Sequence, residues 1–198
     1  MTFAELQNEA QKIYKRARAE AERVESEKAH IREVYTPKIA AENCADEDKA
    51  FSSFVNDCAD EFESKVRACL AKCRESLDKT LSATPTNEQL NLLHVISMRG
   101  ESVSENEFAR LCSLLATNYQ ATKALQAIAK KNNARIHLSD KYDFEALTAS
   151  LEWLESYLSD RVRDLRCFSG HKIGQLGNAF FVEGCRDLNY EERASRFE

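Results

Sequence analysis

Glycine and proline are scarce in this chain of 198 residues, with five and two copies respectively. Because these residues most often mark turns, their scarcity predicts long helices and few connections. No apolar run approaches the roughly 18 residues that a membrane-spanning helix needs, so we expect no membrane partner. Hydrophobic residues make up 43% and charged residues 31% of the chain. This balance is typical of a soluble, folded protein rather than a disordered one.

The seven cysteines are an odd number. The first residues are charged throughout and contain no signal-like stretch, so we expect a cytoplasmic protein with free thiols. Four of the cysteines lie at apolar positions of predicted helices, where a free thiol behaves as a small hydrophobic group. These four are Cys58, Cys69, Cys73 and Cys112.

The stretch from Asp46 to Leu81 has the clearest pattern in the chain. Its apolar residues recur at an average step of about 3.7 residues, close to one turn of an α-helix. They are Phe51, Val55, Cys58, Phe62, Val66, Cys69, Cys73 and Leu77. The pattern predicts one long helix with a single apolar face, which must lie against another long element.

The N-terminal segment predicts the partner of that helix. Thr2 and Glu5 have the spacing of a capping box, and a narrow apolar stripe follows as far as Val34. We interpret Pro37–Glu42 as a short turn or helical fragment and Asn43–Asp46 as the corner. Residues 1–81 are therefore expected to form an antiparallel hairpin of two long helices.

Residues 86–136 are expected to form a small tri-helical subdomain after the break at Ser82–Pro85. Two further capping boxes and a capping asparagine predict its three helix starts. These caps are Thr86 with Gln89, Ser104 with Glu107, and Asn118, and Gly100 is expected to end the first helix.

Residues 139–198 are expected to form a third long helix that packs on the hairpin, followed by a glycine-rich end. Ser139 or Asp140 would cap the helix, and its apolar face runs from Phe144 to Phe168. Within Lys172–Val182 we expect a small hairpin, with residues 179–182 as its second strand. A last short helix is expected from Asn189 to Arg196. The predicted fold is an all-α, elongated bundle of long helices with a small tri-helical subdomain.

No residue pattern predicts a catalytic, cofactor or metal site strongly enough to name one. Cys69 and Cys73 lie one helical turn apart, but a structural zinc site needs four ligands, and no second pair is nearby. Cys167, His171 and Cys185 could form a metal site or a Cys–His dyad, or simply belong to a turn-rich end. We therefore expect no catalytic residues, no cofactor and no enzyme activity.

The order of helices in residues 86–136 resembles the core of winged helix-turn-helix DNA-binding domains. In this resemblance, Phe108–Leu115 corresponds to the support helix and Tyr119–Lys131 to the recognition helix. The residues that would face DNA are Gln120, Thr122, Lys123, Gln126 and Lys130. Residues 82–135 carry six basic and four acidic side chains, whereas the whole chain has a net charge of −5. The alternative interpretation is a three-helix packing unit.

The whole chain also resembles helical proteins encoded among the virion and assembly genes of tailed phages and prophages. The residues that suggest this are the charged N-terminal hairpin, the TPTNEQL junction and the ALQAIAKKNN helix end. The resemblance implies an assembly role and no catalytic residues. We therefore expect a non-enzymatic structural or assembly protein that binds copies of itself or another protein through helical faces. The alternative is a DNA-binding regulator or packaging accessory that uses residues 86–136.

Overall fold

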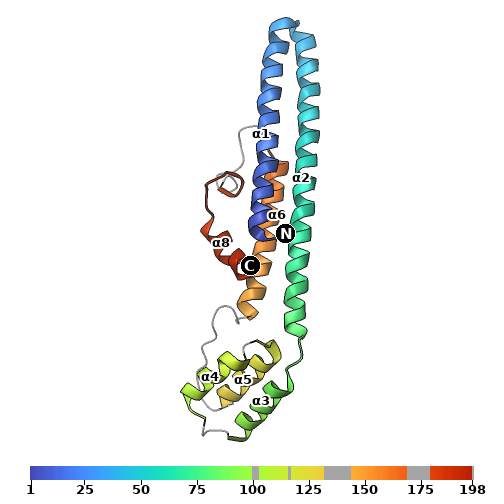
Figure 1. Cartoon of the computed structure of the whole chain (residues 1–198). Helices are drawn as coiled ribbons and strands as arrows, with labels where there is room; N and C mark the ends of the chain where they lie inside the picture. Colours follow the sequence, from blue (N-terminus) through green and yellow to red (C-terminus); the bar gives the residue numbers. More distant parts are fainter. Residues whose placement is uncertain (100–102, 116, 132–143, 169–178, 198) are drawn as a thin grey trace. The chain divides into compact units, whose positions relative to one another are not determined.

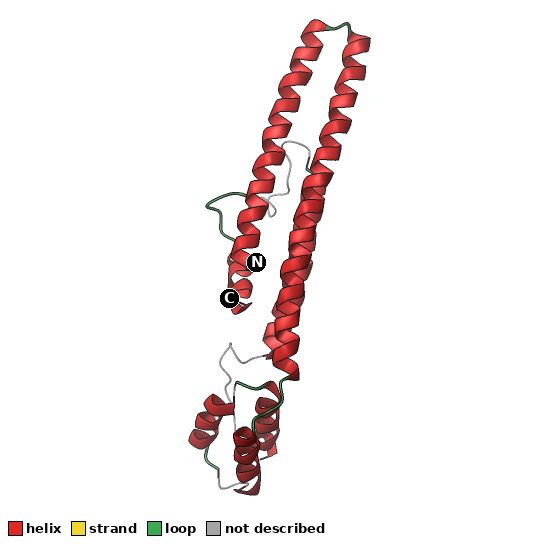
Figure 2. Cartoon of the chain, turned by 45° about the vertical axis from the view of Figure 1, so that its right-hand side comes forward, coloured by secondary structure: helices red, strands yellow, loops and turns green. Residues whose placement is uncertain are grey.

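The computed structural model describes residues 1–99, 103–115, 117–131, 144–168 and 179–197. These residues form helices joined by loops, with no strand among them, and this confirms the all-α fold (Figures 1 and 2). The helices are α1 (Phe3–Val34), α2 (Pro37–Ser82), α3 (Asn87–Arg99), α4 (Glu105–Leu115), α5 (Tyr119–Lys131), α6 (Phe144–Arg166) and α8 (Leu188–Ala194), followed by the 3₁₀ helix η3 (Ser195–Phe197). No helix in the described ranges is both long and apolar enough to cross a membrane.

The chain divides into two compact units. The first contains residues 1–71 and 152–198, and the second contains residues 72–151. Both ends of the chain therefore belong to the same unit. The division falls within α2 and within α6, so each of these helices contributes to both units.

Helices α1 and α2 pack side by side in the first unit (Figure 1). The predicted capping box is present, since Thr2 Oγ1 accepts a hydrogen bond from the Glu5 amide and Glu5 accepts one from the Thr2 amide. Four ion pairs join the two helices. They are Glu9 with Lys65, Arg16 with Glu61, Arg23 with Glu47, and Lys28 with Asp48. From the first of these pairs to the last, the α1 residue rises from 9 to 28 while its α2 partner falls from 65 to 48, so the helices are antiparallel.

The predicted corner of this hairpin at Asn43–Asp46 is wrong. The connection is Tyr35–Thr36, and α2 begins at Pro37 and continues without a break through residues 43–46. Proline fits the first position of a helix because its missing N–H has no partner there in any case. Residues 43–46 contain no glycine or proline that would interrupt the helix.

Helix α6 lies against α2 within the first unit and runs in the opposite direction. Arg166, at the end of α6, donates hydrogen bonds of 2.6 Å to both Asp60 and Glu63 of α2. Just after the helix, the Phe168 ring packs against Tyr14 of α1 and Phe51 of α2. The ring centroids are 5.6 Å and 6.2 Å away, respectively. The chain just after α6 therefore contacts both helices of the hairpin.

The C-terminal segment supplies the aromatic centre of the first unit. Phe180 and Phe181 are fully buried, and their rings lie 6.0 Å and 5.8 Å from the ring of Phe62 on α2. The predicted second strand at residues 179–182 is wrong, because residues 179–181 are helical. Both phenylalanines face inward here, whereas consecutive side chains of a strand would point to opposite faces. The first part of the predicted hairpin, up to residue 178, lies outside the described residues.

The second unit contains the tri-helical packing of α3, α4 and α5. Its core gathers apolar side chains from all three helices and from the loop residue Val103. The buried members are Leu93, Ile96, Val103, Phe108, Leu115, Ala121, Leu125 and Ala129. The three predicted caps are present at Thr86, Ser104 and Asn118. The predicted stop at Gly100 and the caps at Ser139 or Asp140 lie outside the described residues.

Candidate interaction surfaces

The connection between α1 and α2 exposes three large apolar side chains within six consecutive residues. The exposed fractions are 58% for Val34, 47% for Tyr35 and 46% for Ile39. The neighbouring Ile31 and Ala40 are buried and occupy the inward-facing positions of the two helices here, so Val34, Tyr35 and Ile39 remain at the surface. We call Val34, Tyr35 and Ile39 the hairpin-end cluster. Contiguous exposed apolar groups on a charged protein are typical of protein contacts, whereas singly scattered ones are ordinary.

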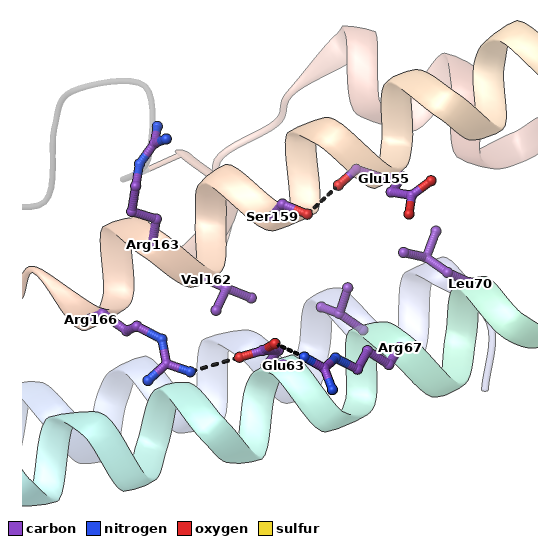
Figure 3. Close-up of a pocket in the computed structure, with 9 residues that line it drawn as sticks. Glu63, Arg67, Leu70, Glu155, Ser159, Val162, Arg163 and Arg166 are labelled. Atoms are coloured by element: carbon purple, nitrogen blue, oxygen red, sulfur yellow. Dashed lines mark hydrogen bonds and ion pairs between the residues drawn. The ribbon is translucent and has the colours of Figure 1, made fainter.

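A groove of about 380 Å³ runs between α2 and α6 in the first unit (Figure 3). Val66, Leu70 and Val162 form its floor and are nearly buried. Its walls carry charged and polar side chains from both helices. They are Glu63, Arg67, Glu155, Ser159, Arg163 and Arg166. The groove therefore combines an apolar base with a charged rim, as protein contact surfaces do.

Ion pairs fix the charged end of this groove. Glu63 lies between Arg166 and Arg67 and accepts a hydrogen bond from each (Figure 3). Arg166 first and Arg67 second lower the pKa of the Glu63 carboxyl, so this group stays ionised. Arg163 pairs with Asp160 on its own helix at 2.9 Å and is otherwise largely exposed.

A second cluster joins α6 to the C-terminal segment through rings and cations. Trp153 and Tyr157 stack at 4.9 Å, and the guanidinium groups of Arg193 and Arg161 lie over the two rings at 4.9 Å and 4.8 Å. Asp187 caps α8 and also accepts a 2.7 Å hydrogen bond from the Tyr157 hydroxyl. Burial first, and Asp187 second, raise the pKa of Tyr157, so the phenol stays protonated. These contacts give Trp153 and Tyr157 a structural role, because they join α6 to the C-terminal segment.

Arg161 is buried within this cluster. Its Nη2 lies 3.3 Å from Asp164, whereas Nε and Nη1 have no hydrogen-bond partner. The Tyr157 ring covers the guanidinium, and this cation–π contact offsets part of the cost of removing the charge from water.

The five residues predicted to face DNA occupy different environments in the second unit. Thr122 is buried, and its hydroxyl donates to the backbone carbonyls of Leu115 and Asn118. The prediction that Thr122 faces DNA is therefore wrong, because helix α5 turns this side chain into the tri-helical core. Sequence reasoning missed this because threonine is usually a surface residue.

The four other residues predicted to face DNA differ in their exposure and in their contacts within the protein. Lys123 forms an ion pair with Glu145 and lies 5.7 Å from the centroid of the Tyr119 ring. The Gln120 amide nitrogen lies 3.4 Å from the Leu81 carbonyl oxygen. Gln126 is half-buried and Lys130 is exposed. One side of α5 is thus occupied by the beginning of α6, where Phe144 packs against Tyr119 at 5.1 Å.

The cysteines do not assemble into a site within the described residues. Cys58 and Cys69 are buried, and burial raises the pKa of the Cys58 thiol. Cys69 donates a weak hydrogen bond to the Met1 carbonyl at 3.7 Å. Cys167 and Cys185 are exposed, and His171 lies outside the described residues. No group of three or more histidine, cysteine or carboxylate residues that could hold a metal ion occurs in the part of the chain that the structure describes.

No known protein family, curated protein or solved structure matches the chain. Only the chemistry of these surfaces therefore bears on the function of the chain.

Proposed function

We propose that this chain is a non-enzymatic structural or assembly protein that binds copies of itself or another protein through its helical faces. The observation that carries this proposal is the hairpin-end cluster of Val34, Tyr35 and Ile39. Fully burying a side chain of this size contributes about 1.5–3 kcal/mol, so three half-exposed groups can contribute substantially to a contact. A protein surface that covers them is the simplest way to gain that free energy.

The distribution of charge supports the same role. Many charged side chains in the first unit form ion pairs along and between helices, which stabilise long helices without providing a reactive group. The resemblance to helical proteins of tailed-phage structural gene clusters also favours an assembly role. In such a role the long helices provide spaced contact surfaces and need no reactive group.

The test is the molar mass of the purified chain measured by light scattering over a wide concentration range. We expect a mass above that of the monomer, 22.5 kDa, which rises with concentration. A mass that stays at the monomer value at the highest concentration would contradict self-association. The double variant Val34→Ser/Ile39→Ser should associate less than the wild type if the hairpin-end cluster is one of the contact surfaces. Leu188→Ser, which changes a single exposed leucine on α8, is the matched control.

A further inference from the structure

The face of α6 that borders the groove with α2 carries charges in a symmetric order. Glu152 and Glu155 precede Ser159, and Arg163 and Arg166 follow it. The steps of three or four residues place all five on one face of the helix. Glu155 and Arg163 are each four residues from Ser159, and Glu152 and Arg166 are each seven residues from it. Along α6, this face therefore carries two carboxylates before Ser159 and two guanidinium groups after it.

We propose that this face of α6 pairs with the same face of a second copy, in an antiparallel arrangement around a two-fold axis at Ser159. A two-fold axis at this point superposes the acidic half of one helix on the basic half of the other. Glu152 and Glu155 of one copy then lie beside Arg163 and Arg166 of the second copy, and the reverse pairs form at the other end. This is an isologous contact, in which one patch serves both copies.

The charge order itself selects the antiparallel arrangement. A parallel pairing in register would place the two glutamates of one copy against those of the other, and arginines against arginines. Like charges brought together disfavour such a contact, whereas complementary charges fix the direction and register of docking. The inference rests on the proposed function in one respect, since it identifies a second copy of this chain as a partner.

The surroundings of the face allow this pairing. The Arg163 side chain is 71% exposed, and its pair with Asp160 is a solvent-exposed contact one helical turn away. Such pairs are weak, so Arg163 can exchange or share its partner at low cost. Arg166 keeps its hydrogen bonds to Asp60 and Glu63, so Arg163 is the more responsive of the two arginines. The groove beside α6 has the buried side chains of Leu70 and Val162 at its base, next to the charges (Figure 3).

Charge reversal tests the pairing, with sedimentation velocity as the readout of dimer formation. Glu155→Arg places arginine against arginine in both halves of the contact, and Arg163→Glu places glutamate against glutamate. Each variant alone should weaken the dimer at least about tenfold. An equimolar mixture of the two variants should restore it, because residues 155 and 163 are both arginine in one variant and both glutamate in the other, so they pair with opposite charge in the mixed dimer. Glu22→Arg, the same charge reversal at an exposed position of α1, should leave the dimer unchanged.

The outcomes separate this inference from the proposed function. If the wild type forms a dimer and neither reversal weakens it, the α6 pairing is wrong and the copies associate through another surface. Loss of the dimer in both variants without recovery in the mixture would also overturn it. A wild-type chain that stays monomeric at every concentration would overturn both this inference and self-association. Far-UV circular dichroism of each variant shows that the helices remain folded, and recovery in the mixture requires that they do.

Discussion

The Tyr190 hydroxyl donates a 2.9 Å hydrogen bond to the backbone carbonyl of Phe3, and the two rings meet edge to face with centroids 6.2 Å apart. These residues lie 187 positions apart in the chain. The contact joins α8 to the first turn of α1, so the two ends of the chain stabilise each other within the first unit.

Tyr190→Phe should lower the free energy of unfolding by about 1 kcal/mol, because it removes one buried hydrogen bond and keeps the ring. Urea denaturation followed by circular dichroism measures the change. Tyr35→Phe, at the exposed hairpin end, should have no measurable effect. An equal loss in both variants would show that the Tyr190 hydroxyl contributes nothing specific.

Phe62→Ala should be among the most damaging single substitutions. Phe62 is fully buried and contacts the rings of both Phe180 and Phe181, so its removal leaves a cavity between α2 and the C-terminal segment. Substitutions of this kind cost about 3–5 kcal/mol. Thermal unfolding should show a large drop in midpoint, whereas Val34→Ala at an exposed position should change it little. A small effect of Phe62→Ala would mean that the aromatic centre does not form as described.

Asn118→Ala should loosen the second unit. The side-chain Oδ1 of Asn118 accepts from the Ala121 amide at 3.0 Å and caps α5, and its Nδ2 donates to the Ala83 backbone carbonyl at 2.9 Å. Loss of a capping asparagine costs about 1 kcal/mol, and the second hydrogen bond is lost with it. Hydrogen exchange of the α5 amides should become faster, while Asn91→Ala on the exposed face of α3 should leave the rates unchanged. Unchanged rates in Asn118→Ala would contradict the capping role.

Acid should destabilise the first unit in a way that depends on Glu9. Hydrogen bonds from Lys12 and Lys65 lower the Glu9 pKa from its ordinary value of 4.5 to about 2. Because the folded-state pKa is the lower one, the contribution of Glu9 is fully present above pH 4.5 and is lost as the pH falls towards 2. Glu9→Gln should therefore reduce stability at pH 7 and flatten its dependence on pH over this range. Equal slopes for the wild type and Glu9→Gln would contradict the assignment. Glu20→Gln, elsewhere on α1, provides the comparison.

Local patterns predicted the helices and most of their starts, and the structure shows where such patterns end. The capping boxes at Thr2, Thr86 and Ser104 depend on residues three apart, so the sequence contains all the information that they need. The predicted corner at Asn43–Asp46 is wrong because no local signal distinguishes a short helical fragment at Pro37–Glu42 from the first turns of a long helix that starts at Pro37. The strand predicted at residues 179–182 failed because a short aromatic run has no periodicity that separates strand from helix.

The candidate surfaces could be predicted from the sequence less well than the fold. A stripe of apolar residues predicts which side of a helix is buried, but the exposure of Val34 and Ile39 depends on where the hairpin turns. The charge order around Ser159 can be read in the sequence once the direction of the α6 face is known. Thr122 illustrates the reverse case, because its polar side chain predicts exposure and the packing of α5 buries it.

The sequence by itself determined that this protein is built from helices, where most of them start, and which residues form their apolar stripes, because these features depend on neighbours within a few positions. Only the tertiary structure decided that the C-terminal aromatic residues fill the space between α1, α2 and α6, and which charged side chains face outward. Those features depend on contacts between separate helices, some of them between residues more than a hundred positions apart, such as Tyr14 with Phe181 and Phe62 with Phe180. No local pattern specifies such contacts, since they depend on the shape left open by all the other elements.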